Sequence, residues 1–369
     1  LGDVYKRQIY FRIPYDSQKD LQDLILDGIK LPCQNFCGAR LCRLHMAESI
    51  LSYADFSEAA LNFANFRSSK MEQCNFSRAD LTGADLSLAN LEHSQFDSAI
   101  LSHTNFRGAN LTGAHFSYAN LSHADFSEAI LDGAIFTNAT IENAIFDKAS
   151  MQRVNLNHQS IKSTSFKSAI LTGSSLEGIH VSDNTSMQNA IMTSCNLSYS
   201  DFEKINLAFV TFENAQILSA YLCGCNLQGA NLSQADLSDS HLRHADLNNS
   251  ILRKAILDNA DISGADLTNA DLRGAYLTHT TLYHANLYKV KADQHMFNSA
   301  IFDSDDWTHW EIEYPNITNS NEASPVENTS ILADLDWIPG DDGSRINWCE
   351  LKIYEKLCTD FEESDEPYE

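Results

Sequence analysis

One large apolar side chain recurs at every fifth position over most of this chain. From Phe36 to Val181 no fifth residue breaks the pattern, and a second series, displaced by one residue, runs from Met187 to Phe302. We call these positions centres; they hold 15 of the 19 Phe residues. A five-residue period fits neither the roughly 3.6 residues per turn of an α-helix nor the alternation of a flat strand. The chain must therefore turn regularly while directing one large side chain inward per unit.

A second inward side chain accompanies each centre. Two residues before most centres the side chain is small, as at Ala54, Ala64 and Ala230, and the other three positions of each unit are mostly polar. Four such units close a square, and each square contacts only the squares above and below it. The pattern therefore predicts an all-β solenoid, stabilised by additive contacts along its length.

Individual units support a family resemblance. Ala79–Gly83, Ala235–Asp239 and Ala265–Asn269 each begin Ala-Asp-Leu. They resemble the A(D/N)LXX units of the pentapeptide-repeat family, and the likeness extends over most of the chain. The resemblance implies a right-handed quadrilateral β-helix, the pentapeptide-repeat solenoid, with four pentapeptides per coil. At a strand spacing of about 4.8 Å it would have about 13 to 14 coils.

The repeat also divides the chain into parts. We expect an N-terminal segment over residues 1–32 and a first repeat stack over 33–181. A one-residue shift of frame follows at 182–186, then a second repeat stack over 187–307 and an acidic C-terminal tail over 308–369. The frame shift falls in a polar spacer that is one residue longer than the other gaps between centres. We interpret it as a bulged corner; a small loop facing a partner is the alternative.

The N-terminal segment combines two features. Asp3–Gln8 resembles a translated transposase adaptor, so we interpret residues 1–8 as foreign and expect the natural start of the protein, with any targeting signal, to be missing. Residues 16–28 begin with N-cap candidates followed by apolar residues at helical spacing, which predicts a capping helix. Such a helix would cover the strand edges exposed at an open solenoid end.

The C-terminal tail carries much of the negative charge. Residues 308–369 contain 16 acidic and 3 basic residues, against a formal net charge of −25 for the whole chain. The segment 337–357 is apolar enough to dock as a short element, whereas 362–369 has the composition of a disordered end. The segment 303–310, at the junction of the second repeat stack and the tail, resembles a terminal unit in which a Trp closes the last coil.

Composition excludes several functional classes. With 25 Lys and Arg against 50 Asp and Glu, the chain lacks the cationic surface that direct nucleic-acid binding needs. It has no apolar run long enough for a membrane segment. The nine cysteines lack metal-site spacing, and Cys74, Cys195 and Cys225 fall at the small inward position, where we interpret them as inert core thiols. Free thiols favour a reducing, cytoplasmic location.

The residue just before each centre points outward, and every twentieth residue follows one side of the solenoid. One such row, the Asn/Asp column, is mostly Asn and Asp, interrupted by Ile145, Ser165 and Ser186. Its candidate partner face is Asn65, Asp85, Asn105, Asp125, Asn226, Asp246, Asp266 and Asn286. In one interpretation these side chains bond to the backbone and to one another; in the other they present an acidic face to a protein.

A second candidate is apolar. Ile130, Ile135 and Ile145 take the outward position on three sides of one coil, forming a candidate contact band. Among the histidines, His103 and His123 share a row one coil apart. No nucleophile or carboxylate set accompanies them. We therefore predict no catalytic, cofactor-binding or metal-binding residues, and no cofactor.

The sequence thus favours a non-enzymatic protein-interaction or scaffold solenoid with a protein partner. One alternative is an acidic DNA mimic acting on a type II topoisomerase, which the resemblance to quinolone-resistance pentapeptide proteins implies. Another is a secreted effector or a fragment of a larger protein. Against the mimic stand the many Asn residues in the column and the location of about half the negative charge in the tail.

Overall fold

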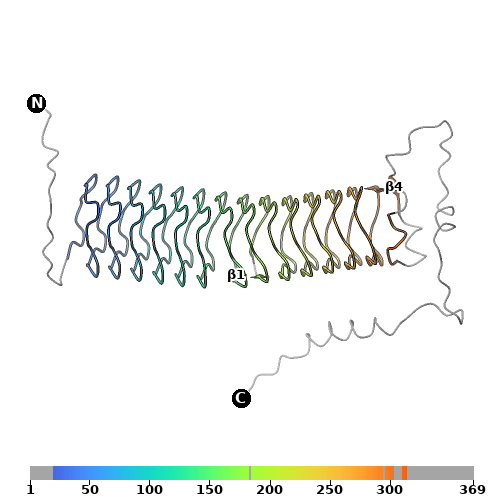
Figure 1. The fold of residues 1–369 in the computed structure, drawn as a ribbon, viewed down its shortest axis with the longest axis horizontal. Helices are drawn as coiled ribbons and strands as arrows, with labels where there is room; N and C mark the ends of the chain where they lie inside the picture. Colours follow the sequence, from blue (N-terminus) through green and yellow to red (C-terminus); the bar gives the residue numbers. More distant parts are fainter. Residues whose placement is uncertain (1–19, 183, 294–295, 303–309, 314–369) are drawn as a thin grey trace, which may run out of the picture. The chain divides into compact units, whose positions relative to one another are not determined.

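The computed structural model describes residues 20–182, 184–293, 296–302 and 310–313, all within one compact unit, Leu1–Thr318. In this unit the backbone climbs in coils that stack along a common axis (Figure 1). Residues twenty positions apart pair as parallel bridges, such as Asn65 with Asp85. Four columns of such bridges result, one for each side of the coil, and this arrangement is a four-sided β-solenoid as the five-residue period predicts.

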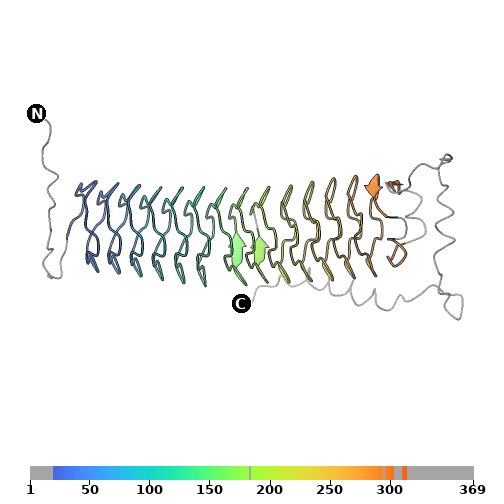
Figure 2. The ribbon, with the colours of Figure 1, turned by 45° about the horizontal axis from the view of Figure 1, so that its top comes forward.

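Short strands occur where pairing extends beyond a single residue. β1 (Ser160–Lys162) pairs in parallel with β2 (His180–Ser182), and the two lie side by side in the middle of the stack (Figure 2). β3 (Val290–Lys291) pairs in parallel with β4 (Ile312–Glu313) near its C-terminal end. The remaining sides of the coils are held by the single-residue bridges.

Each corner is a tight turn. The residue two positions after a centre has a positive φ, as Tyr53 does at 63°, and the next amide closes the turn: Ala54 N–H donates to the Leu51 carbonyl at 3.0 Å. A positive φ at the third residue is typical of a type II turn. The side chains at these corner positions point into solvent, so the corners tolerate residues as different as Tyr53 and Glu58.

Phenylalanine rings fill the interior of the first stack. Phe36 and Phe56 stack with centroids 4.8 Å apart, and Phe106 and Phe126 do so at 4.7 Å. These rings form two columns that meet edge to face, as between Phe96 and Phe106, whose centroids lie 5.8 Å apart. All these rings have no exposed surface. Ring pairs of this kind add about 0.5–1.5 kcal/mol each beyond the burial of their area.

Polar residues at the small inward position bond across coils. Ser94 Oγ donates to the Met71 carbonyl and Thr104 Oγ1 to the Leu81 carbonyl, both at 2.9 Å. Cysteine thiols at this position do the same, such as Cys74 Sγ with the Leu51 carbonyl at 3.1 Å. Burial raises the pKa of each of these thiols to about 12, at Cys74, Cys195 and Cys225. They are protonated core residues, in agreement with their interpretation from sequence.

The predicted capping helix over 16–28 is not found in its described part. Residues 20–28 already form coil sides and corners, with Asp20 paired to Arg40 and Ile25 to His45. The reason is visible in the sequence: Leu21, Leu26 and Leu31 precede Phe36 at five-residue steps, and this period fits the coil better than a helix. The pairing thus begins before residue 33, and residues 16–19 lie outside the described part.

The frame shift and the C-terminal end both show in the pairing. Before the spacer the pairing step is twenty residues, and across it Ser165 pairs with Ser186 and His180 with Asp201, a step of twenty-one.

At the C-terminal end of the stack Trp310 is buried. Its Nε1 donates to the Ala285 carbonyl at 3.0 Å, and its ring centroid lies 5.2 Å from that of Phe302. Trp310 therefore covers the last centres. The tail segments 337–357 and 362–369 lie outside the described residues, as do residues 1–8.

One backbone pairing between coils is absent in the middle of the stack. Among the outward residues from Asp20 to Asp271, each described residue pairs with its counterpart in the next coil except Thr140, which does not pair with Ser160. On either side of this gap the column is regular, because Asn120 pairs with Thr140 and Ser160 with His180. Two neighbouring coils therefore separate locally along one side.

Large corner side chains fold over glycines of the following coil. A Cβ added at Gly83, where φ is +69°, would lie 2.6 Å from Cδ1 of Phe63, whereas at Gly133, with φ of +67°, it would meet nothing within 4 Å. Gly83→Ala is therefore expected to lower the free energy of unfolding by about 2 kcal/mol, from left-handed strain plus displacement of Phe63. Gly133→Ala should cost about 1 kcal/mol from strain alone. Urea unfolding of both variants tests this, and equal losses would contradict the packing of Phe63 on Gly83.

Candidate interaction surface

The Asn/Asp column is fixed by hydrogen bonds to the backbone. In each Asn or Asp of the candidate partner face, the side-chain Oδ1 accepts from the N–H two residues later: at 2.9 Å for Asp85 from Ser87 and at 3.0 Å for Asp246 from Asn248. The same bond anchors Asn65, Asn105, Asp125, Asn226, Asp266 and Asn286. This Asx turn holds the outward residue against its own corner. These bonds agree with the interpretation in which the side chains of the column bond to the backbone.

Two amides also link neighbouring coils along this column. Asn105 Nδ2 donates to Asp85 Oδ1 at 3.1 Å, and Asn286 Nδ2 donates to Asp266 Oδ1 at 3.0 Å. Because each Asp uses Oδ1 for these bonds, its other carboxylate oxygen remains for solvent or a partner. Apart from the interruptions at Ile145, Ser165 and Ser186, the column thus presents one Asn or Asp side chain of fixed orientation per coil, half-buried except for the exposed Asn286.

The candidate apolar band is exposed but divided among sides. Ile130, Ile135 and Ile145 have 44%, 39% and 38% of their surface exposed. Each belongs to a different bridge column, because they pair with Asn110, His115 and Asp125 respectively. Three sides of a coil do not face one flat partner, so a protein contacting all three would have to wrap around the stack.

The histidine pair lies as the sequence predicts. The rings of His103 and His123 stack with centroids 4.7 Å apart and planes 7° apart, on exposed corners. Within the described part of the chain, no group of three or more His, Cys, Asp or Glu side chains is placed to hold a metal ion. A helix of sufficient length and hydropathy to cross a membrane is likewise not found among the described residues.

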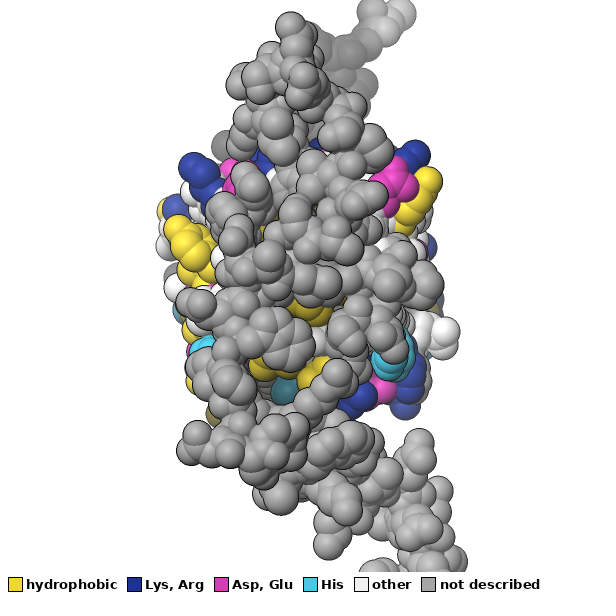
Figure 3. Space-filling view, turned by 90° about the vertical axis from the view of Figure 1, so that its right-hand side faces the viewer, with side chains coloured by type: hydrophobic (Ala, Val, Ile, Leu, Met, Phe, Trp, Pro, Cys, Tyr) yellow, Lys and Arg dark blue, Asp and Glu magenta, His cyan; other side chains and the backbone are white. Residues whose placement is uncertain are grey.

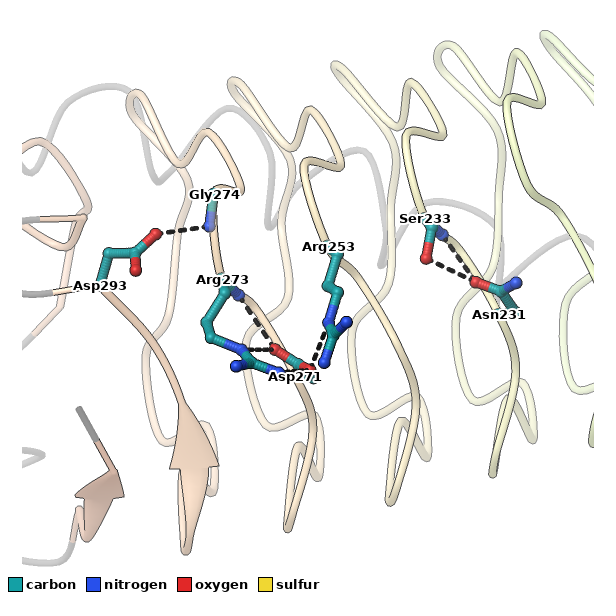
Figure 4. A network of polar contacts seen from close by, with 7 residues as sticks. All are labelled: Asn231, Ser233, Arg253, Asp271, Arg273, Gly274 and Asp293. Atoms are coloured by element: carbon teal, nitrogen blue, oxygen red, sulfur yellow. Dashed lines mark hydrogen bonds and ion pairs between the residues drawn. The ribbon is translucent and has the colours of Figure 1, made fainter. Parts of the chain in front are cut away.

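Sequence reasoning missed an ionic cluster near the C-terminal end of the stack. Asp271 lies between two guanidinium groups: Arg273 Nη2 and Arg253 Nε each donate to Oδ2 at 2.6 Å (Figure 4). Burial by itself would raise the pKa of the Asp271 carboxyl, but the hydrogen bonds from Arg273 and Arg253 outweigh it and hold the pKa at about 2. The sequence held a signal for this cluster: Arg253 and Arg273 are twenty residues apart, which is the length of one coil, so they lie in the same row. Seen along the axis, Lys and Arg side chains lie beside Asp and Glu side chains at the rim (Figure 3).

Comparison with known families identifies the repeat. The family described as "Pentapeptide repeats" matches this chain in overlapping segments from 35–73 through 119–157, at 190–229 and 219–253, and at 255–291. Together these segments cover more than half of the chain. The unmatched interval between 157 and 190 contains the spacer and the strands β1 and β2.

Several solved structures are similar to parts of the chain. HetL, a pentapeptide repeat protein involved in heterocyst differentiation regulation in the cyanobacterium Nostoc sp. strain PCC 7120, is 25% identical, with 72% of this chain and 92% of HetL covered and a TM-score of 0.24. QnrB1, a plasmid-mediated fluoroquinolone resistance protein, is 18% identical, with 74% and 92% covered and a TM-score of 0.27. A pentapeptide repeat protein of the Arabidopsis thaliana thylakoid lumen is 32% identical over 31% of this chain and 73% of its own, with a TM-score of 0.18. No curated protein matches the chain significantly.

Proposed function

The chain belongs to the pentapeptide-repeat family, and from this premise we propose that it is a non-enzymatic protein-interaction scaffold whose Asn/Asp column is the binding face. The observation that carries the proposal is the fixed orientation of the column. An Asx turn holds each of its Asn and Asp residues, so a partner does not have to order these side chains on binding. As part of the same proposal, the protonated thiols at Cys74, Cys195 and Cys225 favour a cytoplasmic location.

The filled interior supports binding at the outer surface. Centres such as Leu81, Phe106 and Leu237 have no exposed surface, so the coils enclose side chains and leave no channel around them. What a partner can contact is therefore the outer rows. Of these, the Asn/Asp column repeats the same chemistry over the largest number of coils.

The alternative of a DNA mimic is less well supported. A mimic must present dense negative charge to a basic cleft. In this column Asn residues separate most Asp residues, and the amides of Asn105 and Asn286 donate to the carboxylates of Asp85 and Asp266. We therefore expect binding to the column to depend on shape and hydrogen bonding, with only a modest loss as salt concentration rises.

A matched pair of double variants tests the binding face. Asp85→Lys with Asn105→Lys changes the column, whereas Asp55→Lys with Asn75→Lys makes the same change on a different column. The control pair has the same amide-to-carboxylate bond at 3.1 Å, and Lys70 and Lys291 show that Lys is accommodated at this position. Proteins captured from a cell extract by the wild-type chain should bind the first variant at least about tenfold more weakly.

The control should bind those same proteins as the wild type does. Equal capture by both variants would remove the Asn/Asp column as the binding face. Inhibition of a type II topoisomerase that weakens steeply with salt, and that is lost in the first variant, would instead favour the mimic.

A further inference from the structure

Backbone hydrogen bonding between coils is interrupted at one level of the stack, where Thr140 and Ser160 do not pair. At this level the N–H groups of Asn138, Ile141 and Ser160 donate to no described residue. One coil earlier all three equivalent N–H groups donate to an adjacent coil, as Leu121 does to the Thr140 carbonyl at 2.8 Å. Three bonds that join regular coils are therefore absent together. We call this level of the stack the interrupted level.

Gln159 is the side chain that departs from the repeat at the interrupted level. Its Nε2 donates to the Phe136 carbonyl at 2.6 Å, which Ala139 N–H also uses at 2.9 Å. Gln159 Oε1 is buried and has no donor within the described structure. The same row holds only Ala in the six preceding coils, at Ala39, Ala59, Ala79, Ala99, Ala119 and Ala139. A buried acceptor without a donor is unfavourable, so closing the coils over Gln159 is less favourable than closing them over Ala.

The interrupted level is also open at the surface. A cleft of about 530 Å³ lies between the two coils, bounded by Thr137–Thr140 and Glu142 on one and by Asn155 and Asn157–Ser160 on the other. Ala139 is partly exposed there, whereas Ala119 in the preceding coil is buried. Solvent therefore has access between the coils at this level.

The aromatic packing of the interior changes at the same level. One column of stacked rings runs from Phe36 to Phe136 and ends there, because the next centre in its row is Leu156. The other column continues across the level, where Phe146 and Phe166 stack with centroids 5.0 Å apart. One aromatic contact between coils is thus absent on the side where the hydrogen bonds are absent, and one is kept elsewhere.

We propose that the interrupted level is a hinge, held open by Gln159, at which the solenoid opens locally and divides into two cooperative units. In a stacked solenoid each coil contacts only its neighbours, so such units separate where the contacts between neighbours are weakest. The contacts that remain, namely the stacked rings of Phe146 and Phe166 and the pairing of Ile145 with Ser165, lie on another side of the coil. The two units therefore stay joined along that side while the side of Thr140 and Ser160 opens.

The hinge also divides the Asn/Asp column. The members from Asn65 to Asp125 precede the interrupted level and those from Asn226 to Asn286 follow it. This consequence rests on the proposed function, whereas the hinge itself does not: two halves of the binding face on separate units can change their relative direction, and a partner that contacts both would fix it.

Hydrogen exchange of the full chain, followed by mass spectrometry, tests the hinge. Amides in 136–141 should exchange at least about a hundredfold faster than those in 116–121, the same positions one coil earlier. Because the comparison lies within the wild-type chain, it needs no variant. Equal protection of the two segments would overturn the proposal.

Gln159→Ser tests the role of the side chain. A Ser at the small inward position bonds to the carbonyl 23 residues earlier, as Ser94 does to Met71 at 2.9 Å, so the variant restores the repeat. Exchange of 136–141 should slow at least about tenfold. Gln228→Ser, at an exposed corner several coils away, is the control and should leave exchange there unchanged. Exchange as fast in Gln159→Ser as in the wild type would contradict the assignment of the hinge to Gln159.

The two cooperative units and the binding face are tested separately. Urea unfolding of the wild type should show two transitions, and Gln159→Ser should bring them together. A single wild-type transition, seen alike by exchange in the coils before and after the interrupted level, would count against two units. The Asp85→Lys, Asn105→Lys variant should keep the wild-type exchange of 136–141, so a failure of the binding face leaves the hinge standing, and the reverse.

Discussion

Leu237→Asp is expected to unfold the coils around it. Leu237 is a centre with no exposed surface, and the backbone there is held by the Leu237 N–H donating to the Ile256 carbonyl at 2.7 Å. Replacing it removes about 2 kcal/mol of apolar burial and places a carboxylate among apolar side chains without a partner, for a total cost of several kcal/mol. Circular dichroism and urea unfolding should show lost β-structure or a much earlier transition.

The adjacent residue provides the matched control. Asp236 points outward, and its Oδ1 accepts from Ser238 N–H at 3.1 Å, a bond that an Asn side chain can also make. Asp236→Asn should therefore change the free energy of unfolding by less than about 0.5 kcal/mol. A Leu237→Asp variant as stable as Asp236→Asn would show that the assignment of inward and outward positions is wrong.

Asp271→Asn is expected to destabilise the C-terminal coils in a pH-dependent way. The pKa of Asp271 is about 2 in the folded chain against a reference value of 3.8. A lowered folded pKa means that the carboxylate contributes stability above pH of about 4, which is lost as pH falls through about 2. The contribution at pH 7 should be about 1–2 kcal/mol, once solvent screening at the half-exposed Arg253 is allowed for.

The difference in free energy of unfolding between wild type and Asp271→Asn separates the contribution of the Asp271 carboxylate from that of the other carboxylates. Measured by urea unfolding, the stability difference should be full at pH 7 and should shrink between pH of about 4 and about 2. Asp261→Asn is the control, because Asp261 Oδ2 lies 3.6 Å from Arg243 Nε in a looser pair, on the opposite column of the stack. A difference for Asp271→Asn that stays constant down to pH 2 would mean that the two arginines do not stabilise its charge.

The period of five predicts the fold because it acts on every unit in the same way. Each centre and each small residue buries the same kind of side chain against its neighbours, so the inward and outward positions follow from the sequence alone. The helix predicted over 16–28 is wrong for residues 20–28, because Leu21, Leu26 and Leu31 continue the five-residue frame of the centres and this part of the chain pairs as a coil. The Asn/Asp column could be read from the sequence because a step of twenty residues is the length of one coil.

Local departures from the regular contacts between coils could be found only in the tertiary structure. Gln159 could be recognised in the sequence as a poor fit at a small position, but the bond from its Nε2 to the Phe136 carbonyl, and the absent pairing between Thr140 and Ser160 beside it, are visible only in the folded coils. The ring of Phe63 over Gly83 and the two arginines around Asp271 likewise depend on side-chain rotamers in adjacent coils. The sequence by itself therefore determined the coil, its inward residues and its outward rows, because these repeat with the backbone. Only the tertiary structure decided the absent pairing beside Thr140 and the ionic cluster around Asp271, because each depends on how particular side chains meet their neighbours in adjacent coils.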